Sequence, residues 1–400
     1  MKKMILAGLA LAALAGLSSC SKTSVVNPAD NANDGIGFRT FAGASVRGTE
    51  FDRTAMATPG FSVAAFGNSE MYFGVTTVKP SDTSDLTKVW NTDGKSYTWP
   101  SYELSFYAYA NLPTGNTATL NKTTKTIALS TQAKVADQKD IVAAYNKGTR
   151  ASHETSGVPM YFKHILSQVE VKAKNSGTDN QQYTVKVAGV KIGRIKSAAT
   201  FTYPSTETSS SSTLAYTDYN YGTTATVSSF FAGSSSEQTL GSTAVSLMNS
   251  TNGNFMIIPQ ETTAWNQSET YGNGTAGTDN AGTYLGILVQ IKSKDGAAIY
   301  PTDGNYAFAT TPLDVDFEPG KKYVITVDFV NGAGFEEPNN TSDTTETTDK
   351  PTGVTITSDQ PTGTTDVPGK PILGGPIKFT VTVENWEAAT ASDINMTPTE

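Results

Sequence analysis

The chain has 400 residues and carries 37 acidic against 29 basic side chains, so its formal net charge at pH 7 is −8. An acidic chain is poorly suited to bind nucleic acid or anionic membrane surfaces, which argues against both functions. The hydrophobic fraction of 37% is enough for packed cores, and a chain of this length is expected to form about two domains. A single cysteine excludes an internal disulfide, so the fold is not held by cystine bridges.

The N-terminus has the layout of an export signal. Two lysines precede the apolar run 4–17, which is shorter than the roughly 20 residues that span a bilayer. A large aliphatic residue and two serines then lead to Cys20, an order that resembles the bacterial lipobox. In such signals the peptide is cut before the cysteine, which is then acylated. We therefore expect a signal peptide at 1–19 and a lipid on Cys20; the alternative is a structural thiol.

Short strand patterns dominate the first part of the expected mature chain. Residues 20–37 are rich in Ser, Asn, Asp and Ala and predict a flexible tether. The apolar runs 61–66 and 71–78 flank a Gly-Asn-Ser-Glu turn signal, which predicts a hairpin. Residues 102–110 alternate between two faces, as a strand does. An N-terminal β-sandwich is predicted over 38–157.

A second β-sandwich is predicted over 158–332. Its opening stretch, 162–171, mixes helical and strand spacing, so we expect a helical turn that leads into a strand. The alternation slips at Gly189, which indicates a bulge. Alternating apolar residues on both sides of Glu-Pro-Gly-Lys at 318–321 give the strongest hairpin signal in the chain.

The C-terminal part changes character twice. Residues 333–375 are rich in Thr, Asp, Pro, Asn and Gly and predict a linker without a core. Residues 376–400 contain one more strand and a tail. Four apolar residues share one face of that strand: Ile377, Phe379, Val381 and Val383. The chain as a whole predicts an all-β fold class, with two tandem β-sandwich domains and a tethered C-terminal strand.

The residue types offer no catalytic or metal-binding constellation. His153 and His164 lack the cysteine or paired-histidine context of a zinc site; we expect a structural role for His164 and a solvated His153. No nucleophile elbow, phosphate loop or dinucleotide fingerprint is present. The prediction is therefore a protein that is not an enzyme and that needs no cofactor and no metal.

Two other functions stay open as alternatives. The four tryptophans could stack on sugars, as in a non-catalytic outer-membrane glycan-binding lipoprotein, although tryptophan in a β-sandwich more often lies in the core. A β-sandwich glycoside hydrolase is a distant third possibility, which would need two carboxylates facing each other across a cleft.

Several segments follow one another in an order typical of one family. They are the lipobox at Cys20 and the stretches 105–113, 158–173, 254–260, 317–329 and 376–386. Together they resemble the fimbrillin family, the subunits of type V pili in Bacteroidales. The resemblance implies two sandwiches of transthyretin-like topology in an outer-membrane lipoprotein precursor that is displayed at the cell surface in a fimbrium and supports adhesion. It implies as partners other fimbrial subunits, the outer membrane through the lipid, and host or bacterial surface ligands.

The resemblance also implies a maturation step. Stalk subunits of this family are cut after an arginine near the N-terminus, which removes the lipidated segment and a first strand. The groove left behind accepts a C-terminal strand from a neighbouring subunit. Arg47 is the preferred cleavage candidate because it follows a small, flexible stretch, and Arg39 and Arg53 are less favoured. Anchor and tip subunits differ from this pattern, and the long linker would equally let the last strand fold back.

Overall fold

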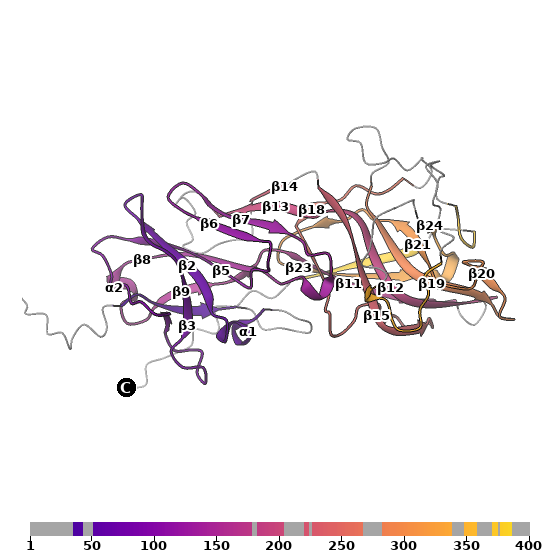
Figure 1. Ribbon diagram of the computed structural model, residues 1–400, viewed down its shortest axis with the longest axis horizontal. Coiled ribbons are helices and arrows are strands. Elements are labelled where there is room, and N and C mark those ends of the chain that lie inside the picture. The colour runs from indigo at the N-terminus through magenta and orange to yellow at the C-terminus, as the bar shows by residue number, and fades with distance from the viewer. Residues whose placement is uncertain are drawn as a thin grey trace, which may run out of the picture.

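A computed structural model describes the chain over residues 35–42, 51–177, 182–203, 220–223, 226–266, 282–337, 348–357, 370–374 and 377–385. The fold is all-β, as the sequence predicts. Figure 1 shows an elongated molecule in which the indigo and purple N-terminal strands fill one end and the orange C-terminal strands fill the other.

The N-terminal end is built on an eight-stranded sheet with the order β10-β8-β5-β2-β3-β4-β1-β9. Its strands are β1 (Gly37–Phe41), β2 (Phe61–Gly67), β3 (Glu70–Pro80), β4 (Trp90–Thr92), β5 (Leu104–Ala110), β8 (Val142–Gly148), β9 (Val158–Tyr161) and β10 (Lys163–His164). Short helices α1 (Arg53–Ala57), η2 (Val135–Asp137) and α2 (Arg150–His153) lie between them in sequence. Neighbouring strands are antiparallel except for β1 and β9, which are parallel.

Both faces of this sheet are covered. On one face the sheet curls, so that Phe38 of β1 contacts Phe106 of β5 within a shared apolar core. On the other face lies a four-stranded sheet, β14-β13-β7-β6, with Phe201 and Tyr107 in a second core. Its strands are β6 (Thr117–Leu120), β7 (Lys125–Ser130), β13 (Ala198–Thr202) and β14 (Asn220–Thr223).

Two further sheets form a sandwich at the C-terminal end. The five-stranded sheet has the order β16-β11-β23-β25, with β17 paired to β11; the strands are β11 (Ser167–Lys174), β16 (Val245–Ser246), β17 (Phe255–Ile257), β23 (Lys321–Asp328) and β25 (Lys378–Asn385). The facing sheet has the order β15-β12-β19-β21-β24, with β20 paired to β19; the strands are β12 (Tyr183–Lys196), β15 (Val227–Thr239), β19 (Tyr284–Ser293), β20 (Ala298–Tyr300), β21 (Ala307–Pro312) and β24 (Phe335–Glu336). Side chains such as Val171, Ile287 and Ile325 alternate inward from both sheets into the largest core of the described residues.

The sheet memberships cut across the predicted boundary between residues 157 and 158. Strands β9 and β10 lie in the first sheet, and the hairpin of β13 and β14 joins β7. The stretch 162–171 contains β10 and β11 and no helical turn, so the helical expectation is wrong. Pairing partners on two sheets fix this stretch as extended, and local spacing could not reveal that.

The strongest hairpin signal of the sequence is a corner between sheets. β22 (Asp316–Phe317) pairs with β18 (Gln260–Glu261), whereas β23 pairs with β11 and β25. The Tyr323 hydroxyl accepts a hydrogen bond from the Glu318 amide and donates to the Asp316 carbonyl, both at 2.7 Å. These bonds redirect the chain after the turn. The bulge expected at Gly189 is confirmed, because β12 shifts register there against both of its neighbours.

Parts of the predicted linker pack on the C-terminal sandwich. Strand β24 lies within the predicted linker and follows the short helix η4 (Phe329–Asn331). The side chains of Val354 and Ile372 are 2% and 5% exposed and belong to apolar cores. The expectation that 333–375 buries no core is therefore wrong for these stretches, because single apolar residues in a polar segment suffice to fill gaps on an existing sheet.

Candidate functional site

Strand β1 is an inner strand of the eight-stranded sheet. It forms two antiparallel pairs with β4 and four parallel pairs with β9. Beyond these ladders, the Ile36 amide donates to the Tyr97 carbonyl and the Phe162 amide donates to the Phe41 carbonyl, each at 2.7 Å. Removing β1 would therefore expose unpaired backbone groups on both neighbouring strands at once.

The inward face of β1 fills an apolar slot. Ile36, Phe38 and Thr40 alternate along the strand and are 3%, 0% and 1% exposed. The Phe38 ring packs edge-on against the rings of Phe61 and Phe106, with centroids 5.7 and 5.4 Å apart. Without β1 this slot would be open to water and lined by aromatic and aliphatic side chains.

The outward face of β1 is confined at one end. A Cβ atom on Gly37 would overlap Cγ1 of Val89, so only glycine fits there while Val89 keeps its position. At the other end the Phe41 ring stacks on Tyr161 with centroids 4.7 Å apart. Arg39 lies between them, half-buried within the ladder.

The chain that follows β1 is anchored at Phe51 by a hydrogen bond that does not involve β1. The Phe51 amide donates to Oδ2 of buried Asp140 at 2.8 Å, and Oδ1 of the same carboxylate lies 2.8 Å from Nδ1 of His164. The structural role expected for His164 is thus confirmed. Asp52 then caps helix α1, where its Oδ1 accepts from the Ala55 amide at 2.7 Å. The segment 43–50 therefore joins two separately anchored parts of the chain.

The sequence-predicted cleavage and lipid sites occupy different positions. Arg39 is inside β1, and Arg53 is the first residue of helix α1. Arg47 lies within 43–50 and Cys20 within 1–34, so both are outside the described residues.

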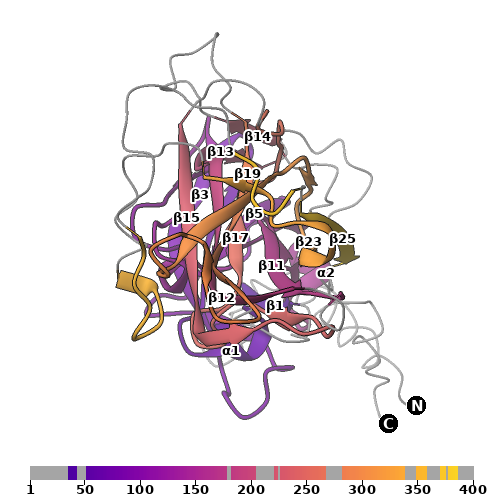
Figure 2. The same ribbon diagram turned by 90° about the vertical axis from the view of Figure 1, so that its right-hand side faces the viewer.

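The final strand β25 folds back on its own chain. It forms eight antiparallel pairs with β23 and occupies the edge of that sheet among the described strands, as Figure 2 shows. Of the four apolar residues predicted to share a face, Ile377 is buried and Phe379 and Val381 are half-buried against the C-terminal core. Val383 is 53% exposed.

The fimbrillin-like family model matches residues 56–386, which is most of the chain. The chain belongs to the fimbrillin-like family. This family consists of fimbrial subunits at the cell surface, and the chain is one of them. Among curated proteins, none matches the sequence significantly.

Solved structures with a similar arrangement include two fimbrial proteins. A fimbrial protein from Bacteroides vulgatus is 15% identical, with a TM-score of 0.47 over 88% of this chain and 99% of its own. The fimbrial anchor protein Mfa2 from Porphyromonas gingivalis is 9% identical, with a TM-score of 0.32 over 74% of this chain and 90% of its own. At these low scores the family assignment rests on the sequence match.

The tryptophans of this fimbrillin-like chain do not form an exposed sugar-binding platform in the described part. Trp90, Trp99 and Trp265 are 0%, 8% and 1% exposed, and Trp386 lies outside the described residues. His153, expected to be solvated, is half-buried beside the Trp99 ring, and burial lowers its pKa. The glycan-binding alternative therefore gains no support from the described tryptophans.

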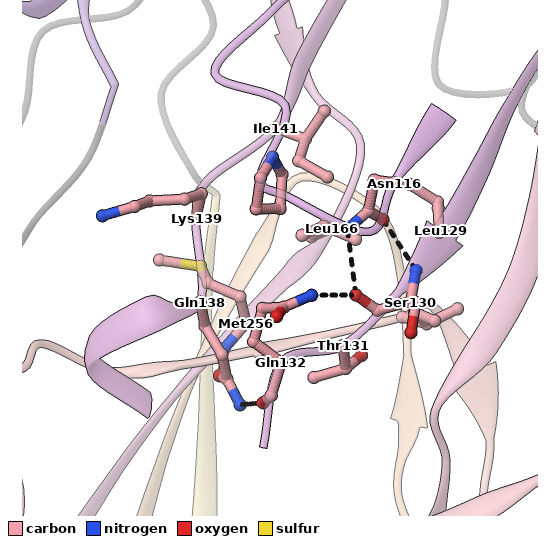
Figure 3. Close-up of a pocket in the computed structure, with 12 residues that line it drawn as sticks. Asn116, Leu129, Ser130, Thr131, Gln132, Gln138, Lys139, Ile141, Leu166 and Met256 are labelled. Atoms are coloured by element: carbon pink, nitrogen blue, oxygen red, sulfur yellow. Dashed lines mark hydrogen bonds between the residues drawn. The ribbon is translucent and has the colours of Figure 1, made fainter. Parts of the chain in front are cut away.

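A small pocket lies between the two ends of the molecule (Figure 3). Its polar lining groups bind one another: the Ser130 amide donates to Asn116 Oδ1 at 2.7 Å, and the Met256 amide donates to Gln138 Oε1 at 2.8 Å. Gln138 also donates from Nε2 to the Gln132 carbonyl at 2.9 Å. These polar groups are therefore already hydrogen-bonded within the protein, and the bond from Met256 to Gln138 links segments far apart in the sequence.

The described residues contain no group of three or more His, Cys, Asp or Glu side chains that could hold a metal ion. Within the ranges given above, no helix has the length and apolar character needed to cross a bilayer.

The resemblance implied a first strand ahead of the cleavage site, but the residue pattern was not used to place β1, and residues 20–37 were expected to form a tether. The available signal is the alternation of Ile36, Phe38 and Thr40. Sequence reasoning also missed the contact between Asp140 and the Phe51 amide. Nothing in the sequence indicates that pair, because the partners are 89 positions apart.

Proposed function

We propose that this fimbrial subunit is exported as an outer-membrane lipoprotein precursor and polymerises by strand exchange after losing β1. The lipid on Cys20 holds the precursor at the membrane. A cut after Arg47 then releases the lipidated segment together with β1. The slot between β4 and β9 accepts the C-terminal strand of a neighbouring subunit, and the resulting fimbria support adhesion to host or bacterial surfaces.

The observation that carries this proposal is the separate anchoring of the chain on the two sides of Arg47. β1 ends at Phe41, whereas Phe51 is fixed by Asp140 and the core. A cut in between would free β1 without breaking the hydrogen bond between Phe51 and Asp140. Arg39 is a poorer substrate because its backbone is paired in a ladder, and proteases bind an extended, unpaired chain.

The C-terminal strand has the properties that a donor needs. It supplies backbone groups for both ladders of the slot and alternating apolar side chains for its interior. Each side chain that becomes fully buried contributes about 1.5–3 kcal/mol. Its present position on β23 satisfies one edge of the strand and leaves Val383 exposed. We therefore expect the C-terminal strand to be more stable in the slot, where both of its edges are paired, than on β23, where one edge is paired.

N-terminal sequencing of the surface form tests the processing step. A mature chain that begins at Gly48 is expected, and an Arg47→Lys variant should retain the precursor N-terminus because the protease is specific for arginine. Arg39→Lys is the matched control and should be processed normally. A surface form that still carries acylated Cys20 would contradict the release of β1.

Deletion of residues 376–400 tests the donor strand. The mature chain should form laddered oligomers on gels run without boiling, and the deletion should abolish them. Unchanged ladders would rule out the C-terminal strand as the donor.

A further inference from the structure

Strand β12 carries a lysine–glutamate pair in water and another in a dry site. Lys186 Nζ lies 2.6 Å from Oε1 of Glu237, and these side chains are 39% and 47% exposed. Lys191 Nζ lies 2.5 Å from Oε1 of Glu337, and these side chains are 2% and 4% exposed. The first is an ordinary surface ion pair. The second holds an amine against a carboxyl group where water is excluded.

We propose that the side chains of Lys191 and Glu337 condense to an amide, which closes a covalent link between β12 and the chain that follows β24. This inference is separate from strand exchange and does not depend on it. The bond between Lys191 Nζ and Glu337 Cδ forms, and the bond between Cδ and Oε1 breaks. Oε1 leaves as water with two of the three ammonium protons, so the step needs no oxidant, reductant or further reactant.

The pair lies on the outer face of the sheet that contains β12 and β19. Lys191 points away from the sandwich core, because its neighbours Val190 and Ile192 belong to that core. Across the ladder Lys191 pairs with Gly286. A Cβ atom on Gly286 would lie 3.3 Å from Phe308 Cδ1 and 3.7 Å from Lys191 Cβ. Glycine at this position therefore leaves room above β19 for the two long side chains to meet.

Tyr284 brings a hydrogen-bond donor to the carboxyl group. Its ring lies over Gly193, where a Cβ atom would approach Tyr284 Cζ to 2.1 Å, so only glycine fits beneath the ring. The Tyr284 hydroxyl donates to Oε1 of Glu337 at 2.9 Å. A donor at this oxygen stabilises the negative charge that develops on it as it leaves Cδ. On the other side, the centroid of the Phe308 ring lies 4.0 Å from Lys191 Nζ and confines the amine.

Burial favours the uncharged forms that react. A charged pair in a dry site loses the hydration of both ions, and this cost can exceed the Coulomb attraction between them. One proton that moves along the 2.5 Å contact from Nζ of Lys191 to Oε1 of Glu337 gives an amine and a carboxylic acid. The neutral amine has the lone pair that attacks Cδ. Exclusion of water then protects the amide from hydrolysis.

The exposed pair shows why the reaction is confined to Lys191. Glu237 has the same kinds of partners, because the Tyr306 hydroxyl donates to its Oε2 at 2.6 Å. The hydrogen bonds from Lys186 and Tyr306 hold the pKa of Glu237 below its ordinary value, so it remains a carboxylate at neutral pH. Water solvates the exposed charges of this pair. The same functional groups therefore stay an ion pair in water and become an amide in the dry site.

The amide gives this chain a covalent tie that cysteine does not supply, since a single cysteine excludes an internal disulfide. The linked residues are 146 positions apart. A link across such a long loop restricts the unfolded chain, as a disulfide does. It also fastens β24, which pairs with β21 only at Phe335 and Glu336 among the described residues. The edge of the sheet is thereby held at the point where the chain leaves β24.

The mass of the intact, denatured chain tests the amide. We expect a mass below that of the sequence between the observed termini by one water, about 18 Da. Proteolytic digestion should release a branched peptide that joins Lys191 to Glu337. A Lys191→Met variant should have the full mass. Lys186→Met is the matched control and should keep the loss of one water, because its pair lies in water.

A parent chain at full mass would overturn the proposal. A loss of one water that persists in Lys191→Met would also overturn it, since the dehydration would then lie elsewhere. Should Lys191→Met fail to fold, the branched peptide of the parent chain decides: its presence establishes the link, and its absence from a complete digest overturns it. None of these results bears on strand exchange.

A Tyr284→Phe variant tests the hydrogen-bond donor. It keeps the ring over Gly193 and removes the hydroxyl that donates to Glu337. The linked fraction at a fixed time after synthesis should be smaller than in the parent chain. An equal fraction would contradict the part assigned to Tyr284.

Discussion

Replacing Phe38 by alanine tests whether β1 stabilises only the unprocessed chain. The side chain is fully buried and packs edge-on against two other rings. Loss of a buried phenylalanine side chain costs about 3–5 kcal/mol through lost burial and the cavity left behind. With a urea m-value of about 2 kcal/mol per molar, the unfolding midpoint of the N-terminal end should fall by about 1.5–2.5 M.

The assay follows urea unfolding of the dilute full chain by tryptophan fluorescence, before and after treatment with an arginine-specific protease. Trp90 is a suitable reporter because it pairs with Phe38 across the ladder. Before treatment, Phe38→Ala should be destabilised by the amount above. After treatment it should match the parent, since both chains have then lost β1. Phe106→Ala is the control: its side chain is equally buried in β5, so it should destabilise both forms.

Two results would refute the reasoning. If the stability difference between Phe38→Ala and the parent persists after proteolysis, β1 stays in the sheet when the chain is cut. If the two precursors unfold at the same urea concentration, the Phe38 ring does not stabilise the slot.

Three further substitutions test other contacts. Lys191→Met should cost about 3–5 kcal/mol, because Lys191 Nζ lies 2.5 Å from Oε1 of buried Glu337 and the carboxylate would keep the Tyr284 hydroxyl but lose its counter-ion. A Lys191→Met/Glu337→Leu double variant should recover much of this in urea unfolding, and no recovery would argue against the pair. Asp140→Ala removes the acceptor of two buried hydrogen bonds and should cost about 1–3 kcal/mol, seen as a lower thermal midpoint, whereas an unchanged midpoint would contradict that contribution. Gly233→Ala should undock segment 348–357, because the new Cβ overlaps a carbonyl there; hydrogen exchange should speed up in that segment, and unchanged protection would contradict the packing.

Local patterns in the sequence predict much of the strand structure. The Gly-Asn-Ser-Glu turn between the apolar runs gives the β2–β3 hairpin, in which Asn68 and Ser69 adopt positive φ angles. The slip at Gly189 predicts the bulge in β12. The alternation at 377–383 predicts β25. In each case the signal lies within a few residues, where turn chemistry and side-chain alternation act.

Pairing partners were less predictable, as the turn at 318–321 shows. Its flanking residues alternate as in a hairpin, yet the two strands join different sheets. The neighbours of strand β1 in the candidate site were equally hard to predict, because β4 and β9 come from distant parts of the sequence. The apolar residues of the last strand are visible in the sequence, whereas its return to β23 is not.

By itself, the sequence determined which residues alternate, where the chain turns, and that the chain resembles an exported β-protein of the fimbrillin family. Only the tertiary structure decided that β1 lies between β4 and β9, that Phe51 is anchored apart from it, and that 158–164 return to the first sheet. The physical reason is that ladder hydrogen bonds join backbone groups, which are the same for almost every residue. Side-chain alternation records which face of a strand is buried, but not which strand lies beside it.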